Sequence, residues 1–353
     1  LNYKKKLLMK KRIKKINILT FFIFGSIFFY SCGAEINEHI IAEEEVENIS
    51  RIVLIQKESN PAFSYITDLS INSYNPNWSP NKEYFAFISE KNNSKDLWIS
   101  DNQGINLRIL NNNLGYVEDY HWSPNSKEIA IEFEYQNNSS NIYLYNLESE
   151  NLLPITRSDK KASLGSWSPD NKWIVYTIEN SIYVSNPKGV NEIYITEGQN
   201  PYWSPNGEYI LFSRINNAIN SLYIFEDVDK ILKNVGNQKD EMELKKNNVK
   251  KIHTNESINI IEAEWAFGGN KILYVSDSSG NNEIYIHEIR NKKNSRLTNN
   301  EVDEKNISWS ERNKSIIFTS NAHGRADIYK MKGDGSNQEI ILNSNENFKR
   351  LDW

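Results

Sequence analysis

The sequence predicts an all-β fold, a β-propeller of four-stranded blades with seven blades and a last blade that is split between the two ends of the chain. Three observations predict this fold. Trp recurs at a nearly regular spacing, the same order of turn and strand signals follows each Trp, and N-terminal segments supply the strands that the last copy lacks. A repeat of about 40–45 residues is typical of one propeller blade.

The recurring Trp residues mark the first strand of each blade. They lie 44, 45, 36, 62, 44 and 44 positions apart. They are Trp78, Trp122, Trp167, Trp203, Trp265, Trp309 and Trp353. A single blade cannot bury both of its faces, so blades stack around an axis, and Trp supplies a large apolar area for that stacking. We therefore expect these residues to be structural.

Turn and strand signals follow each Trp in a fixed order. Four copies continue with Ser-Pro and then Asn, Asp or Gly, residues that favour tight hairpins. A largely apolar run comes next, such as 83–89 and 271–276, and runs without alternation indicate strands that are covered on both faces. A third strand carries an aliphatic-aromatic pair such as Leu97-Trp98, and a short fourth strand ends in Thr, as at Thr156.

The N-terminal part of the chain completes the last blade. Six full copies precede Trp353, which opens a seventh. Residues 51–55 and 62–67 match a third and a fourth strand, and 38–43 suit a second strand. A blade assembled from both termini closes the ring and leaves no exposed edge strand. The propeller is expected over 51–353; a six-bladed ring, with the terminal segments packed elsewhere, is the alternative.

The first residues form a separate segment. Residues 1–31 have a basic head and an apolar run, which is typical of a secretory signal peptide and short for a membrane-spanning helix. Cys32 is the only cysteine, so no internal disulfide is possible. Its position resembles the lipobox of bacterial lipoproteins, which implies a lipid on Cys32 and a lipidated tether over 32–50. The alternative is an idle thiol in an anchor helix.

The charge of the chain argues against a nucleic-acid partner. Residues 1–31 contain eight Lys or Arg and no Asp or Glu; without them, 33 basic residues stand against 46 acidic ones, a net charge of −13. Binding to nucleic acid depends on cationic groups that release counterions from the phosphate backbone. We therefore expect no nucleic-acid role, and membrane attachment only through lipid at Cys32.

The register of these repeats resembles the WD40-like propeller repeat of the TolB family over 51–353, and residues 320–337 come closest to the family's consensus. The resemblance implies a rigid ring whose rim binds protein partners. In architecture and anchoring the chain also resembles the propeller lipoprotein of the outer-membrane barrel-assembly machinery.

Polar residues beside the Trp positions are the candidate binding site. Asp119, His121, Glu262, Glu264 and Asp352 lie in the expected innermost strands, which surround the axial tunnel where propellers commonly bind ligands. Acidic pairs there suit a cation or a basic peptide segment. The alternative is the ordinary hydrophilic lining of a water-filled tunnel.

One blade carries an insertion. Trp203 and Trp265 are 62 positions apart, more than the usual spacing, and the additional residues fall within 226–248. Within this segment Ile231, Leu232 and Val235 are spaced like one face of a short helix. Between the third and fourth strands it would project on the face with the Trp-Ser-Pro turns and offer a partner-binding surface. The alternative is a solvated loop of mixed charge.

The sequence carries no convincing nucleophile motif, phosphate-binding loop or metal-ligand spacing, so no catalytic residue, cofactor or metal is expected. The leading hypothesis is a non-catalytic cell-envelope lipoprotein whose propeller scaffolds a protein complex. Expected partners are envelope proteins, such as components of outer-membrane protein assembly or of the Tol-Pal system. Gly33 after the lipidated cysteine favours the outer membrane facing the periplasm, with surface display as an alternative. The competing hypothesis is a propeller that binds a small ligand or cation in its tunnel, with or without enzymatic activity.

Overall fold

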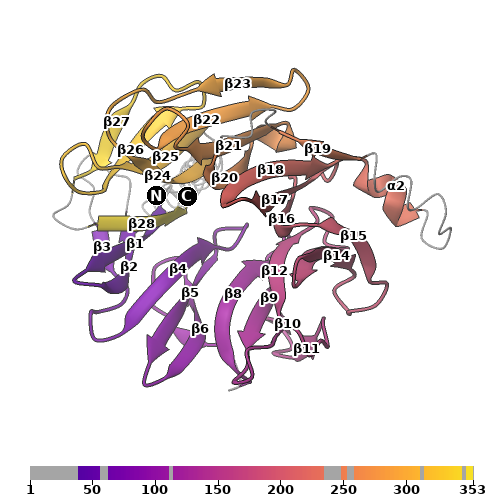
Figure 1. Ribbon diagram of the computed structural model, residues 1–353. Coiled ribbons are helices and arrows are strands. Elements are labelled where there is room, and N and C mark those ends of the chain that lie inside the picture. Colours follow the sequence, from indigo (N-terminus) through magenta and orange to yellow (C-terminus); the bar gives the residue numbers. More distant parts are fainter. Residues whose placement is uncertain are drawn as a thin grey trace, which may run out of the picture.

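The computed structural model is a ring of seven four-stranded antiparallel sheets (Figure 1). The structure describes residues 39–55, 63–110, 114–233, 248–252, 258–310, 314–343 and 347–352. Seven blades confirm the predicted propeller, and the six-bladed alternative is wrong. The apolar runs predicted as second strands and the aliphatic-aromatic pairs predicted as third strands occupy those positions in six blades.

Six blades are continuous in the chain, and each runs from an inner to an outer strand. The first two are β4 (Asn72–Trp78), β5 (Tyr84–Lys91), β6 (Ser94–Asp101), β7 (Arg108–Ile109), then β8 (Tyr116–Trp122), β9 (Glu128–Glu134), β10 (Ser140–Asn146), β11 (Leu152–Pro154). The next two are β12 (Ala162–Trp167), β13 (Ile174–Ile178), β14 (Ser181–Ser185), β15 (Ile193–Glu197), then β16 (Gln199–Trp203), β17 (Ile210–Asn216), β18 (Ile219–Phe225), β19 (Val249–Lys251). The last two are β20 (Ile260–Ala266), β21 (Lys271–Ser276), β22 (Glu283–Glu288), β23 (Lys293–Arg296), then β24 (Glu304–Ser310), β25 (Ser315–Ser320), β26 (Asp327–Lys332), β27 (Glu339–Leu342).

The seventh blade joins the two ends of the chain. Its order is β28 (Asn347–Asp352), β1 (Ile40–Val46), β2 (Ile49–Ile55) and β3 (Phe63–Tyr65). β28 pairs antiparallel with β1, with Ala42 opposite Leu351. The predicted split blade is therefore confirmed. The expected boundary at residue 51 is wrong, because β1 lies within the segment assigned to the tether and supplies the second strand of this blade. Trp353 lies outside the described residues.

The Ser of the Trp-Ser-Pro motif closes the hairpin between the first and second strands. Ser79 Oγ accepts a hydrogen bond from the Tyr84 N–H at 3.0 Å and donates one to Asn81 Oδ1 at 2.7 Å. The same two bonds recur at Ser123, Ser168 and Ser204. We call the side of the ring that bears these four hairpins, at 79–83, 123–127, 168–172 and 204–208, the Trp-Ser-Pro face.

The core lies between the blades. Five of the repeated Trp residues are only 5% to 8% exposed, and Trp309 is half-buried. Trp167 packs with Ile142 of the preceding blade and Tyr176 of its own. The ring is thus held by contacts of each blade with its neighbours, as the repeat predicts.

The predicted insertion lies where it was expected. α2 (Val228–Lys233) follows β18 and precedes β19, the third and fourth strands of one blade, and it stands out from the rim in Figure 1. A short 3₁₀ turn, η1 (Phe267–Gly269), follows β20. No helix within the described ranges is both long and apolar enough to cross a membrane.

Candidate functional site

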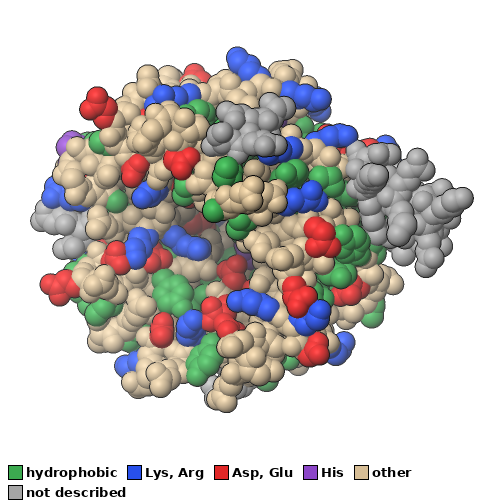
Figure 2. Space-filling model, in the orientation of Figure 1, with side chains coloured by type: hydrophobic (Ala, Val, Ile, Leu, Met, Phe, Trp, Pro, Cys, Tyr) green, Lys and Arg blue, Asp and Glu red, His purple; other side chains and the backbone are tan. Residues whose placement is uncertain are grey.

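An axial cavity brings together the five polar residues predicted as a binding site. Its volume is about 720 Å³, and its lining includes Asp119, His121, Glu262, Glu264 and Asp352. The space-filling view shows the ring hollowed near its centre, with acidic and basic side chains around the hollow (Figure 2). Because these residues come from three different inner strands, β8, β20 and β28, only closure of the ring places them together.

A bulge in the inner strands directs these side chains into the cavity. The register of the inner strand against the second strand shifts just before the Trp in all six continuous blades. A bulge bends a strand and re-aims the adjacent side chains. Asn75 and Asn306, three positions before their Trp, have positive φ angles of 56° and 52°. Positions one and three before most of the repeated Trp residues therefore supply much of the lining.

Side chains one position before the Trp bind the backbone of the next blade. Asp352 Oδ2 accepts a hydrogen bond from the Trp78 N–H at 2.6 Å. Glu264 Oε1 accepts one from the Trp309 N–H at 3.3 Å. A third bond of this kind, at 2.7 Å, joins the hydroxyl of Ser166 to the N–H of the following blade's Trp. Two of the five candidate residues thus hold neighbouring blades together.

At the other described interfaces, the indole replaces the backbone N–H as the donor. The indole N–H groups of Trp122, Trp167 and Trp265 donate to the backbone carbonyls of Asn77, His121 and Tyr202 at 3.3, 3.2 and 3.1 Å. The indole nitrogens of Trp78, Trp203 and Trp309, whose backbone N–H groups bind side chains, are buried without a hydrogen-bond partner. Each of these six Trp residues therefore uses one of its two donors across the blade interface.

A second set of carboxylates binds the bulges. Glu43 Oε2 accepts a hydrogen bond from the Asn75 N–H at 3.1 Å, and Glu132 Oε2 accepts one from the Leu164 N–H at 2.8 Å. Glu262 receives the corresponding backbone N–H groups in the following blade. Bulges leave backbone donors outside the strand ladder, and buried donors need partners. Glu262 is therefore also a structural residue, although its Oε1 is buried without a hydrogen-bond partner.

Burial sets the protonation of the cavity carboxylates. Burial raises the pKa of Glu262 to about 7. Burial also raises the pKa of Glu264 to about 8, and the nearby charges of Asp352 and Glu262 add to the rise. Burial acts to raise the pKa of Asp119, but the adjacent His121, the hydrogen bond from the Tyr120 N–H and the charge of Arg350 outweigh burial, so this pKa is lowered. Near neutral pH the cavity thus holds protonated and ionised carboxyl groups side by side.

The structure adds lining residues that the sequence analysis missed. Arg350 reaches the cavity from β28 and donates a hydrogen bond to Asn75 Oδ1. Tyr202 also lines the cavity, and its ring meets that of His121 edge-on at a centroid distance of 5.6 Å. Arg350 lies three positions and Tyr202 one position before a repeated Trp. The same register that selected Asp119 would have found both.

Asp119 and His121 lie close to each other in this cavity. His121 Nε2 lies 3.6 Å from Asp119 Oδ2, too far for a hydrogen bond. Asp119 Oδ1 instead accepts hydrogen bonds from Asn75 Nδ2 at 3.1 Å and from the Tyr120 N–H at 2.8 Å. Within the ranges that the structure describes, no group of three or more His, Cys, Asp and Glu residues is placed to hold a metal ion.

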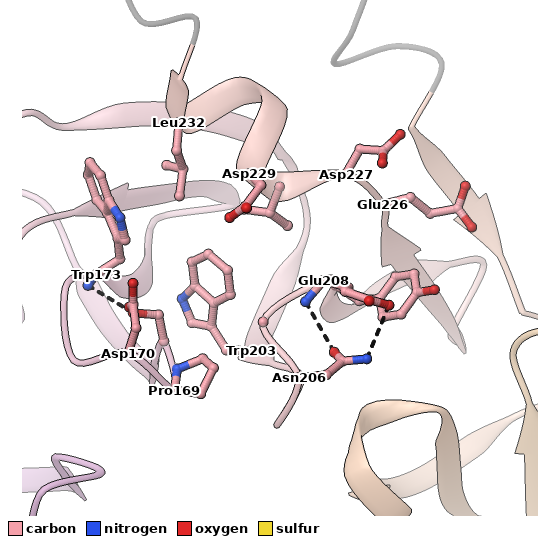
Figure 3. A pocket seen from close by; sticks show the side chains of 14 residues that line it. Pro169, Asp170, Trp173, Trp203, Asn206, Glu208, Glu226, Asp227, Asp229 and Leu232 are labelled. Atoms are coloured by element: carbon pink, nitrogen blue, oxygen red, sulfur yellow. Dashed lines mark hydrogen bonds between the residues drawn. The ribbon is translucent and has the colours of Figure 1, made fainter.

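The insertion borders a second pocket, of about 600 Å³, on the Trp-Ser-Pro face (Figure 3). Of the three residues proposed for partner binding, Ile231 is fully buried and packs into the core, so its side chain is not available to a partner. Leu232 is half-buried and lines the pocket. Val235 lies outside the described residues, as does Cys32.

The comparisons with known proteins agree with this architecture. The model of the PD40 family, described as the TolB beta propeller domain, matches residues 59–241 and 242–351. A putative Tricorn-like protease C-terminal subunit from Sulfurisphaera tokodaii is 30% identical over 134 residues, which are 35% of this chain and 15% of that protein. This chain therefore spans a small part of that relative's length.

Solved structures share the fold at low sequence identity. TolB from Acinetobacter baumannii has a TM-score of 0.57 at 13% identity, over 89% of this chain and 66% of that one. The β-propeller domain of the Trilobed protease from Pyrococcus furiosus, described as having an open velcro topology, has a TM-score of 0.61 at 14% identity, over 86% of this chain and 94% of that one. The match of the family model over most of the chain shows that it belongs to the TolB beta-propeller family.

Proposed function

We propose that this protein is a non-catalytic scaffold of the cell envelope, anchored by a lipid on Cys32, whose propeller binds protein partners. One observation carries the proposal: three of the four carboxylates that line the axial cavity are engaged by the backbone of a neighbouring blade. Asp352 and Glu264 accept hydrogen bonds from Trp backbone N–H groups, and Glu262 receives the N–H groups of a bulge. Groups that hold the ring together are poorly suited to change protonation state in every turnover of a reaction.

The envelope location rests on the sequence. The basic and apolar segment before Cys32 has the form of a lipoprotein signal, and Gly33 follows the cysteine. The chain also belongs to the TolB beta-propeller family. We propose the outer membrane facing the periplasm as the site of anchoring, with envelope proteins as partners, among them components of outer-membrane assembly or of the Tol-Pal system.

Affinity purification tests the scaffold proposal. The tagged, lipidated protein is cross-linked in intact cells, solubilised gently and purified, and the proteins that accompany it are quantified by mass spectrometry. The Cys32→Ala variant serves as the matched control for the anchor. A stoichiometric envelope protein in the wild-type sample supports the scaffold, whereas recovery of the protein alone in monodisperse form contradicts it.

The second candidate function is ligand binding in the axial cavity. It is favoured by Glu262 Oε1, a buried carboxylate oxygen that has no hydrogen-bond partner. The relatives include proteases, so an enzymatic role in the same cavity belongs to this candidate. A thermal shift that depends on a small molecule or cation, and that disappears in the Glu262→Gln and Glu264→Gln variants, would favour this function over the scaffold.

A further inference from the structure

The pocket beside α2 is separate from the axial cavity and takes no part in the axial site. Two neighbouring Trp-Ser-Pro hairpins supply one wall, through residues such as Asp170 and Asn206. The end of β18 and α2 supply the other, through residues such as Glu226 and Asp229 (Figure 3). The inserted helix therefore turns an open groove between two blades into a pocket.

The lining of this pocket is acidic. Five of its residues carry carboxyl groups, and no Lys or Arg is among the lining residues; the five are Asp170, Glu208, Glu226, Asp227 and Asp229. Three of them pair with lysines on the same turn or helix, at 2.7 to 3.2 Å, but those lysine side chains are 60% to 76% exposed. Pairs that solvent surrounds are weak, so a cationic ligand can replace the lysines at small cost.

The floor of the pocket is aromatic and carries an unused hydrogen-bond donor. Trp203 lies at its centre and Trp173 at its side (Figure 3). Trp203 is only 6% exposed, and its indole nitrogen is buried without a hydrogen-bond partner. In Figure 3 that nitrogen faces the side of the pocket on which Asp170 lies. A buried N–H without a partner is costly, so a ligand that brings an acceptor oxygen gains the energy of that bond.

We propose that this pocket binds a basic segment of a partner protein. A peptide backbone supplies the carbonyl oxygen that the Trp203 indole N–H lacks, and Lys or Arg side chains on the segment supply positive charge to the carboxylates around it. The alkyl stems of those side chains pack on Trp173 and Leu232, which line the same pocket. This inference rests on the scaffold function proposed above and specifies the chemistry of the partner.

Peptide binding tests the pocket. The probe is a fluorescein-labelled peptide of sequence Gly-Ser-Lys-Leu-Lys-Ser-Gly, compared with the same peptide carrying Gln in place of both Lys. We expect fluorescence anisotropy to show binding of the Lys peptide that weakens as salt is raised. The Asp170→Asn, Asp227→Asn, Asp229→Asn triple variant should raise Kd by about tenfold or more, since each exposed charge pair is worth roughly twofold to fivefold.

The variants are chosen to leave the fold intact. Asn already occupies the position of Asp170 in the three other Trp-Ser-Pro hairpins and makes the same bond to Ser, so Asp170→Asn retains the turn. Trp203→Phe removes only the N–H donor and part of the ring, and should weaken binding by about threefold to tenfold. The control is Glu179→Gln on the opposite face. The Glu179 carboxylate pairs with Lys160 at 2.9 Å, and its replacement should leave the Kd of the peptide unchanged.

Two outcomes separate this inference from the scaffold function. Equal binding of the Lys and Gln peptides, or an unchanged Kd in the triple variant, overturns the pocket assignment. If wild-type protein still recovers an envelope partner from cells, the scaffold function survives that failure. If no partner is recovered but the peptide binds in the predicted way, the pocket assignment stands and the scaffold function fails.

Discussion

Replacing matched Trp residues by Phe isolates the hydrogen bonds between blades. Trp167 and Trp203 are almost equally buried, at 5% and 6% exposure, but only the Trp167 indole N–H has a partner, the His121 carbonyl at 3.2 Å. Both replacements remove the same part of a buried ring, so the loss of stability that comes from the space left behind is similar in the two variants and nearly cancels in their difference. Trp167→Phe also loses a hydrogen bond worth about 1 kcal/mol, whereas Trp203→Phe removes a buried donor that lacks a partner, a relief of about 1 kcal/mol.

We therefore expect Trp167→Phe to lower the free energy of unfolding by about 2 kcal/mol more than Trp203→Phe. Urea denaturation followed by circular dichroism measures the difference, and the comparison is valid where the two variants share one dependence on urea concentration. Similar midpoints for the two variants, or a larger loss for Trp203→Phe, would refute the assignment of donors at these interfaces.

Three further variants test the cavity and the ring. The pKa of Glu264 is raised to about 8, so between about pH 5 and pH 8 the folded protein retains a proton that the unfolded chain has released. The free energy of unfolding should therefore fall as the pH rises through this range. Glu264→Gln still accepts from the Trp309 N–H, and its denaturation midpoints should depend less on pH. Asp352→Ala should lower the free energy of unfolding by about 1–3 kcal/mol, because it removes the acceptor of the Trp78 N–H between the split blade and its neighbour. Asp352→Asn should restore most of this stability, and thermal melting measures both changes. A Cβ at Gly165 would lie 2.4 Å from a carbonyl oxygen of the next blade, so Gly165→Ala should lower the melting temperature. An unchanged melting temperature would contradict the close approach of these strands.

The sequence predicts most of this fold because each blade repeats one pattern. The Trp spacing and the strand signals after it give seven blades, and the incomplete copy at Trp353 predicts the split blade. The N-terminal limit was less accessible, because β1 (Ile40–Val46) has no Trp beside it; its residues suited a second strand, and it pairs with the adjacent β2 and with β28 from the other end of the chain. The pairing with β28, some 300 residues away, has no local sequence signal.

The candidate site was predictable in position but not in role. The positions one and three before a repeated Trp place Asp119 and Glu264 in one cavity. If every such position had been considered, Arg350 would have been included. That Glu264 and Asp352 bind backbone N–H groups of the next blade depends on bulges and on contacts between blades, which residue types alone do not specify. The helical spacing of the insertion identified α2 (Val228–Lys233), but not that Ile231 points into the core.

Native mass spectrometry of the assembly purified from gently solubilised membranes tests the central claim most directly. It is measured for the wild type and for the Glu262→Gln, Glu264→Gln double variant. A scaffold whose cavity carboxylates are structural predicts one mass, this chain with a protein partner in an integral ratio, in both samples. A bare chain that carries a small-molecule adduct in the wild type and loses it in the double variant would contradict the scaffold and identify the axial cavity as the binding site.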